Sequence, residues 1–302
     1  CAPAASNQIT VVVHDSVVIS DELLASFKKQ TGIEVTLVKA GDTGSMTNKL
    51  VLTKDEPLGD AVYGIDNTFA SLATKNGVID GDLTAIDYGD VCMNYDKTWF
   101  SINEQAAPSS IKDLIKSEFD GLTVIENPTT SSVGLAFLTA TISAFGDYGW
   151  QGYWSSLKKN NVKVVASWED AYYTHFSGSS GKGKYPIVLS YSSSPAYEVR
   201  DNGESQTEAL LDACYRQTEY AAVLTNAKNP EAAAKFVTFL RSAEFQSTLA
   251  ENMYVYPVID GVKLPEAWAQ FARTTDTPIG GELDVNTNRE AWLKAWSALF
   301  AG

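Results

Sequence analysis

The 302-residue chain has no apolar run approaching the 18 residues that a membrane-spanning helix needs, so we expect a soluble protein. Basic residues are also scarce: 23 lysines and arginines stand against 37 aspartates and glutamates, for a formal net charge of −14. This balance argues against binding to nucleic acid or to an anionic lipid surface. An acidic protein can concentrate a cationic ligand near its surface, but solubility explains most of this charge.

Cysteine is nearly absent as well. The three cysteines, Cys1, Cys92 and Cys214, form no CxxC pattern, and their odd number predicts neither a disulfide framework nor a zinc site. The small, polar residues that follow Cys1 (APAASNQ) are typical of a bacterial lipoprotein whose N-terminal cysteine carries a lipid. We therefore expect membrane contact only through a lipid on Cys1, with the domain outside the cytoplasm, in the periplasm or on the outer face of the cell membrane.

The sequence does contain alternating strand and helix patterns. Residues 8–14 (QITVVVH) are valine-rich and predict a strand, Leu23, Leu24 and Phe27 mark a helical stripe, and residues 33–38 predict the next strand. A strand, a helix and a second strand in this order predict a parallel sheet. Further strands are expected at residues 61–65, 122–126, 162–165 and 187–191.

Two longer extended segments, residues 85–95 and 219–224, suit strands that cross from one domain to another. The length of the chain allows two domains. We therefore predict an α/β fold with two lobes, each a mostly parallel sheet flanked by helices. Lobe I comprises residues 1–86 and 219–262, and lobe II residues 87–218 and 263–302. The crossing strands would form a hinge, with a cleft between the lobes.

The segment at residues 186–200 (PIVLSYSSSPAYEVR) is the strongest site signal. A strand at 187–191 ends in three serines, of which Ser193 is the central one, and Tyr191 and Tyr197 flank this polar turn. Ligands bind at the carboxyl ends of strands in open α/β sheets. The phenols and hydroxyls therefore predict the wall of a small-molecule site, and a Ser-Pro turn with two packed tyrosines is the alternative interpretation.

Other polar and aromatic residues follow predicted strands or helices. Asp15 and Asp66 supply negative charge, with Asn67 beside the latter, and Ser131 stands where a helix begins, so its neighbouring N–H groups favour an anion or an ordinary cap. Trp168 and Tyr254 offer aromatic faces, which attract cations by about 0.5–2 kcal/mol per good contact. Together these residues predict a flat cationic ligand with an anionic tail.

Six motifs make a resemblance specific: GIDN (64–67), IDYGDVCMNYDK (86–97), NPTTSSVGL (127–135), SWEDAY (167–172), VLSYSSSPAY (188–197) and YPV (256–258). Through them, nearly the whole sequence resembles the periplasmic thiamine-binding proteins of bacterial ABC importers. The resemblance implies a type II periplasmic binding protein fold and capture of thiamine, or its mono- or pyrophosphate, in the cleft. It also implies delivery to a membrane permease by a monomer without catalysis or cofactor.

The resemblance also implies roles for single residues. Trp168, Tyr197 and Tyr254 would pack on the ligand rings, Asp66 would face the cationic part, and Ser131 and Tyr191 would serve the phosphate or hydroxyethyl end. The full candidate set is His14, Asp15, Asp66, Asn67, Ser131, Trp168, Tyr191, Ser193, Tyr197 and Tyr254. Two of them depart from the family pattern: His14 stands where the family often has tyrosine, and Tyr254 stands where the family can have tryptophan.

Two alternatives belong to the same fold family. In a thiaminase I-like enzyme, Cys92 would be the nucleophile, although a buried structural cysteine is the favoured interpretation because no histidine or lysine adjoins it. In a ferric-ion or other cation carrier, His14 and His175 would join the adjacent Tyr172 and Tyr173. Adjacent helical side chains point about 100° apart, which instead favours one packed and one exposed tyrosine.

Overall fold

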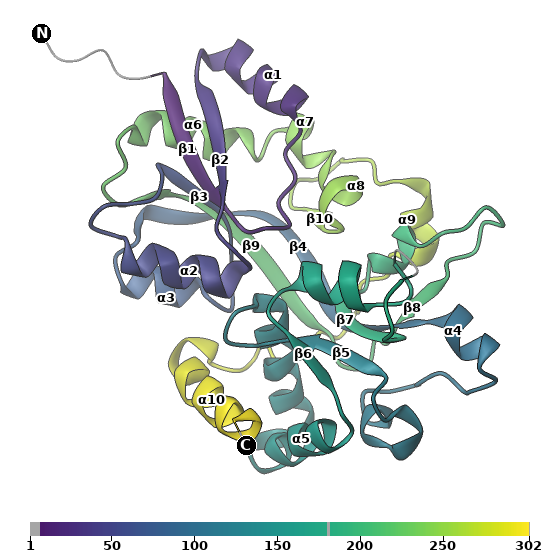
Figure 1. Cartoon of the computed structure of the whole chain (residues 1–302). Coiled ribbons are helices and arrows are strands. Elements are labelled where there is room, and N and C mark those ends of the chain that lie inside the picture. The colour runs from purple at the N-terminus through teal and green to yellow at the C-terminus, as the bar shows by residue number, and fades with distance from the viewer. Residues whose placement is uncertain (1–6, 180–181, 302) are drawn as a thin grey trace, which may run out of the picture. The chain divides into compact units, whose positions relative to one another are not determined.

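The computed structural model describes residues 7–179 and 182–301 of the chain, which divides into two compact units (Figure 1). Unit 1 comprises Cys1–Tyr88 and Thr218–Leu264, and unit 2 comprises Gly89–Gln217 and Pro265–Gly302. The lobes predicted from the sequence have boundaries at 86/87, 218/219 and 262/263. That these segments are the domains of the protein stays a prediction. Cys1, the predicted lipid anchor, lies outside the described residues.

Unit 1 is built on three parallel strands. β1 (Gln8–Val13) lies between β2 (Glu34–Lys39) and β3 (Ala61–Asp66) and pairs in parallel with both. Because the order 2-1-3 reverses the direction of the crossover, right-handed connections place α1 (Asp21–Thr31) and α2 (Thr43–Leu52) on opposite faces. The predicted βαβ unit is therefore confirmed.

The other helices of unit 1 complete these two layers. Phe27 of α1 packs edge-on against Phe236, with ring centroids 5.2 Å apart, so α6 covers the same face as α1. α3 packs beside α2. The remaining elements are α3 (Ala70–Lys75), α6 (Pro230–Phe239), α7 (Ala243–Gln246), α8 (Leu249–Met253) and β10 (Tyr256–Pro257).

Unit 2 repeats the parallel arrangement, since β5 (Thr123–Glu126) pairs in parallel with both β6 (Lys163–Val165) and β7 (Ile187–Tyr191). α5 (Ser132–Lys159) is long and breaks at Gly146, where φ is 70°. α10 (Val285–Phe300) contacts α5 through Trp154 and Trp296, whose ring centroids are 5.7 Å apart. The other elements are α4 (Lys97–Ile102), η1 (Asp113–Ile115), η2 (Ser117–Phe119), η3 (Asp170–His175, a π-helix), η4 (Ser194–Tyr197), β8 (Thr207–Ala209) and α9 (Glu266–Phe271).

Both segments predicted to cross between domains are strands. The chain passes from unit 1 to unit 2 within β4 (Ile79–Asp96) and back within β9 (Tyr215–Leu224). β9 pairs antiparallel with β3 in unit 1, and β4 pairs antiparallel with β7 and β8 in unit 2. The α/β class is confirmed, but each sheet is mixed rather than mostly parallel, because the crossing strands run against the parallel ones.

The cysteine prediction is wrong in one respect. Cys92 on β4 and Cys214, directly before β9, form a disulfide within unit 2 with their Cα atoms 4.6 Å apart. They are 122 residues apart in sequence, so no local spacing pattern announces the pair. Among the described residues, no helix has both the length and the apolar character needed to cross a bilayer.

Candidate functional site

The candidate residues divide equally between the two units. In unit 1, His14 and Asp15 follow β1 directly, Asp66 ends β3, and Asn67 follows it. Because β1 and β3 are parallel neighbours, these residues gather at one edge of the sheet. Tyr254 ends α8 in the left-handed conformation, with φ 61°. Unit 2 holds Ser131, Trp168, Tyr191, Ser193 and Tyr197.

His14 is buried, and both of its ring nitrogens have a polar neighbour. Nδ1 accepts a hydrogen bond from the Ser16 N–H at 3.2 Å, and Nε2 lies 3.0 Å from Oε1 of Glu219. Since Nδ1 is an acceptor, Nε2 carries the proton of a neutral imidazole. Burial lowers the pKa of His14 against the opposing pull of nearby carboxylates. Gly64 has a φ of +107°, and a Cβ there would meet the His14 ring at 2.1 Å, so only glycine allows this approach.

A buried proton-holding cluster adjoins His14. The Tyr63 hydroxyl donates a 2.5 Å hydrogen bond to Oδ2 of Asp87. Burial, and then the charge of Glu219, raises the pKa of Asp87 well above its usual value. Burial, and then the charge of Asp66, raises the pKa of Glu219 to about 8. Glu219 therefore retains its proton at neutral pH in the folded protein.

Asp66 organises the turn that follows β3. Its Oδ1 accepts hydrogen bonds from the Thr68 N–H at 3.1 Å, the Thr68 hydroxyl at 2.7 Å and the Phe69 N–H at 3.1 Å. The side chain is completely buried. These donors favour the ionised carboxylate, so the turn supplies a fixed negative charge at the sheet edge.

Asn67 and Asp15 hold neighbouring backbone segments in place. Asn67 exchanges two 3.0 Å hydrogen bonds with Thr218 of β9, one through its backbone N–H and one through its side-chain oxygen. Asp15 accepts a 3.0 Å hydrogen bond from the Gly41 N–H. Both residues therefore have a structural role at the predicted edge, whatever ligand contact they make.

In unit 2, Trp168 lies in an aromatic cluster. Its indole N–H donates to the Ser190 hydroxyl at 2.9 Å, and Ser190 in turn contacts the Ser194 hydroxyl at 2.8 Å. One ring face stacks on Tyr172, with centroids 5.0 Å apart, and the ring meets Tyr191 at 6.3 Å. The structure therefore brings together two of the aromatic residues predicted at this site, Trp168 and Tyr191.

Tyr191 also connects to the start of α5. Its hydroxyl donates to Oε1 of Gln217 at 2.6 Å, and Nε2 of Gln217 donates to the Ser132 hydroxyl at 2.8 Å. Ser131 is the N-cap of α5, as predicted, and its hydroxyl accepts from the Gly134 N–H. This chain of polar contacts joins the Tyr191 phenol to a helix N-terminus, the kind of position that favours an anionic group.

The polar turn after β7 is a 3₁₀ helix, η4. Ser193 is buried immediately before it, and its backbone carbonyl accepts from the Ala196 N–H. Tyr197, at the end of η4, packs edge-on against Trp268, with centroids 6.5 Å apart. Tyr197 therefore contacts α9 through Trp268.

The structure bears on the two alternative functions, a cation carrier and a thiaminase I-like enzyme. Tyr172 is buried and its hydroxyl donates to Glu198 at 2.8 Å, whereas Tyr173 is 45% exposed, so the predicted split between these two residues is confirmed. Within the described parts of the chain, no group of three or more His, Cys, Asp or Glu residues could hold a metal ion. Cys92 is buried as favoured, but its sulfur is bonded to Cys214, so it is not the free thiolate that a nucleophile requires.

Sequence reasoning missed Gln217 and Glu219. In β9 the buried residues alternate, and Tyr215, Gln217 and Glu219 all occupy the buried phase. Polar side chains in the buried phase of a strand need partners, which is the signal that identifies them. Sequence reasoning also missed Asp87, which is likewise a buried polar residue within a strand, β4.

Comparison with known proteins gives consistent matches over both units. Residues 60–276 match the family described as bacterial extracellular solute-binding protein. The chain is 30% identical to the thiamine-binding periplasmic protein of Salmonella typhimurium, over 98% of this chain and 94% of that protein. It is 29% identical to the protein of the same name from Escherichia coli, over 90% and 85%. A solved structure described as a periplasmic thiamin binding protein has a TM-score of 0.83 and 27% identity, covers 97% of this chain and 96% of its own, and confirms the predicted fold class.

Proposed function

Because the chain belongs to the family of bacterial extracellular solute-binding proteins, we propose that it binds thiamine or a thiamine phosphate and delivers it to an ABC transporter permease. The observation that carries the proposal is the near full-length similarity to relatives named for thiamine binding. The site chemistry supports it independently. Thiamine joins a cationic thiazolium ring to a flat pyrimidine, which calls for aromatic faces and fixed carboxylates.

The candidate residues divide the work according to their chemistry. Asp66 supplies the fixed negative charge for the thiazolium. Trp168, Tyr197 and Tyr254 supply ring faces. The polar chain from Tyr191 to the N-terminus of α5, with Ser131 as its cap, supplies donors for a hydroxyl or phosphate. His14, Asp15, Asn67 and Ser193 complete the set by holding the polypeptide that presents these groups.

The protein acts as a carrier outside the cytoplasm and catalyses no reaction. The disulfide of Cys92 removes the nucleophile that a thiaminase-like reaction would use. We propose further that it works as a monomer without a cofactor, with the permease as its macromolecular partner. Incubation with thiamine and an amine nucleophile should therefore leave thiamine intact.

Isothermal titration calorimetry with thiamine, thiamine monophosphate and thiamine pyrophosphate tests the binding directly, and native mass spectrometry of the purified protein tests for retained ligand. The informative variant is Asp66→Asn, which keeps an oxygen to accept the Thr68 and Phe69 hydrogen bonds but removes the charge. Loss of a charge-assisted contact of about 1.5–3 kcal/mol should weaken thiamine binding roughly ten- to hundredfold.

Asp96→Asn is the matched control. Asp96 also ends a strand, is buried, and accepts hydrogen bonds from two backbone N–H groups, those of Thr98 and Trp99, but it is not a site candidate. It should leave the affinity unchanged. No binding of any of the three compounds at millimolar concentration would reject the function, and equal weakening by both variants would reject the role of Asp66.

A further inference from the structure

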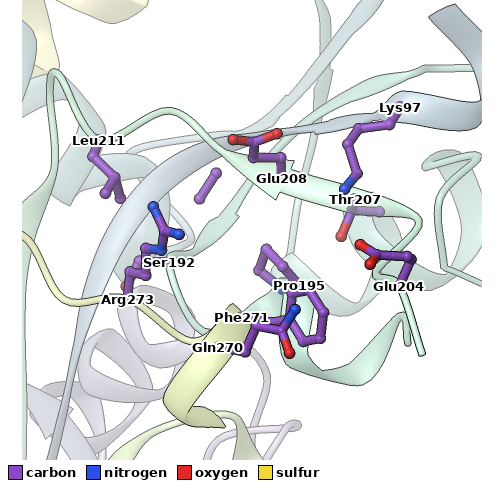
Figure 2. Close-up of a pocket in the computed structure, with 11 residues that line it drawn as sticks. Lys97, Ser192, Pro195, Glu204, Thr207, Glu208, Leu211, Gln270, Phe271 and Arg273 are labelled. Carbon is purple, nitrogen blue, oxygen red and sulfur yellow. The ribbon is translucent and has the colours of Figure 1, made fainter. Parts of the chain in front are cut away.

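Unit 2 contains a pocket that none of the proposed thiamine contacts explains. It has a volume of about 290 Å³ and lies between α4, the β7–η4 turn, the segment around β8, and α9 (Figure 2). Pockets for small organic ligands span roughly 300–1,000 Å³, so this one suits a ligand at the small end of that class. Pro195 and Phe271 give it an apolar side, and the rest of its lining is largely polar.

Two hydroxyl groups in the lining are buried without a partner. Ser192 is 1% exposed and Thr207 is 2% exposed, and neither hydroxyl oxygen has a hydrogen bond to any described residue. Leaving a buried hydroxyl unpaired costs free energy, about 1–3 kcal/mol by mutational data. Each hydroxyl oxygen is closed off from solvent in this conformation, so a rotation about its Cα–Cβ bond would let it pair with a polar ligand in the pocket.

The charges of the lining are balanced. Lys97 and Arg273 are cationic, and Glu204 and Glu208 are anionic. Across the described residues, neither Lys97 nor Arg273 has a carboxylate within 4.0 Å, so the four charges do not neutralise one another in pairs. Glu208 accepts a 2.9 Å hydrogen bond from the Tyr95 hydroxyl, which fixes its carboxylate.

These charges are also separated in space. Arg273 and Ser192 lie at one end of the pocket, and Lys97, Thr207 and Glu204 lie at the other (Figure 2). An arginine fork suits a carboxylate, with a serine hydroxyl as an additional donor. The opposite end offers a carboxylate and a hydroxyl oxygen, which suit an ammonium group.

We infer that this pocket is a second ligand site, for a small zwitterion of the α-amino acid class. Its carboxylate binds Arg273 and the Ser192 hydroxyl, and its ammonium group binds Glu204 and the Thr207 hydroxyl. The site lies entirely within unit 2 and does not depend on the proposed thiamine function.

Isothermal titration calorimetry of the full chain with L-serine, L-threonine and L-glutamine at millimolar concentration tests the inference, in a buffer without amines or carboxylates. At least one of the three should bind. N-acetyl-L-threonine lacks the ammonium group and L-threonine amide lacks the carboxylate, so each should bind at least about tenfold more weakly than L-threonine if threonine is a ligand. The same pair of derivatives is used for whichever amino acid binds.

Variants then locate the site. Arg273→Gln should weaken amino acid binding by about tenfold or more, and Ser192→Ala should weaken it several-fold. Ser192→Ala should leave the melting temperature of the free protein equal or higher, because it removes an unpaired buried hydroxyl. Arg241→Gln, at an exposed arginine of unit 1, should change nothing. Absence of binding by all three amino acids, equal binding of the blocked derivatives, or binding that Arg273→Gln leaves intact would each overturn the inference.

Discussion

Glu219 should make the stability of this protein fall as the pH rises. The folded state raises the pKa of Glu219 from 4.5 to about 8, chiefly through burial. Between these values the folded protein keeps a proton that the unfolded chain releases, so the free energy of unfolding decreases with increasing pH. One pKa unit corresponds to about 1.4 kcal/mol, so the whole shift corresponds to about 5 kcal/mol. This stabilisation is complete below about pH 4.5 and lost above about pH 8.

The substitution Glu219→Gln removes this dependence. Glutamine has nearly the same shape, cannot ionise, and keeps an oxygen at the position of Oε1 of Glu219, which lies 3.0 Å from Nε2 of His14. Below about pH 4.5 the variant and the wild-type protein should have similar stability. Above about pH 8 the variant should be more stable, by up to about 5 kcal/mol.

Urea unfolding followed by tryptophan fluorescence, from about pH 5 to about pH 9, measures the difference. His14, whose pKa burial lowers, gives the opposite slope below its ordinary pKa of 6.5, so the slope that Glu219 causes is read between about pH 6.5 and about pH 8. Glu56→Gln, at an exposed glutamate of the same unit, should follow the wild type. Parallel curves for wild type and Glu219→Gln would refute the reasoning.

Two further predictions concern unit 2. Reduction of the Cys92–Cys214 disulfide, or the double serine variant, should lower the free energy of unfolding by about 5 kcal/mol, because the bond closes a loop of 122 residues; an unchanged urea midpoint would contradict this. Arg216→Met removes the two hydrogen bonds of 2.8 and 2.9 Å that Arg216 donates to the buried Asp90, leaves the one from the Thr275 N–H, and should cost about 3–5 kcal/mol. Arg241→Met on the surface should cost less than about 0.5 kcal/mol. Both are measured by thermal unfolding, and equal effects would count against the ion pair.

Local patterns in the sequence predict much of the fold because they depend on neighbours along the chain. The helical stripe of Leu23, Leu24 and Phe27 lies in α1, which Ser20 and Gly32 bound: the Ser20 hydroxyl accepts from the Leu23 N–H, and Gly32 has a φ of 74°. The strand ends at His14 and Asp66 follow from hydrophobic runs of strand length in the same way. Since parallel strands end at a common edge, these runs also predict that the two residues gather there.

Local patterns do not predict contacts between residues that are far apart in the sequence. Cys92 and Cys214 are 122 positions apart, and the indole of Trp168 meets the hydroxyl of Ser190 across 22 positions. A periodic pattern predicts that such residues are buried but not which other residue each one meets, because that depends on how strands and helices assemble. The disulfide is therefore missed although Cys92 lies within a predicted strand; Cys214 lies directly before β9, which begins four residues earlier than the predicted segment 219–224.

The most useful sequence signal for the site is a local pattern that marks residues with distant partners. In β9 the side chains of Gln217 and Glu219 are two positions apart, so the pleat directs them to the same face of the strand. Gln217 holds Tyr191, a residue of unit 2, and Glu219 contacts His14, a residue of unit 1. A strand stabilised only by packing would carry apolar residues at both positions, because each buried polar group costs free energy unless it is paired. Polar residues in the buried phase of a strand therefore mark positions where a specific polar contact has overridden apolar packing, and here they lead to both sets of candidate residues without any knowledge of the partners.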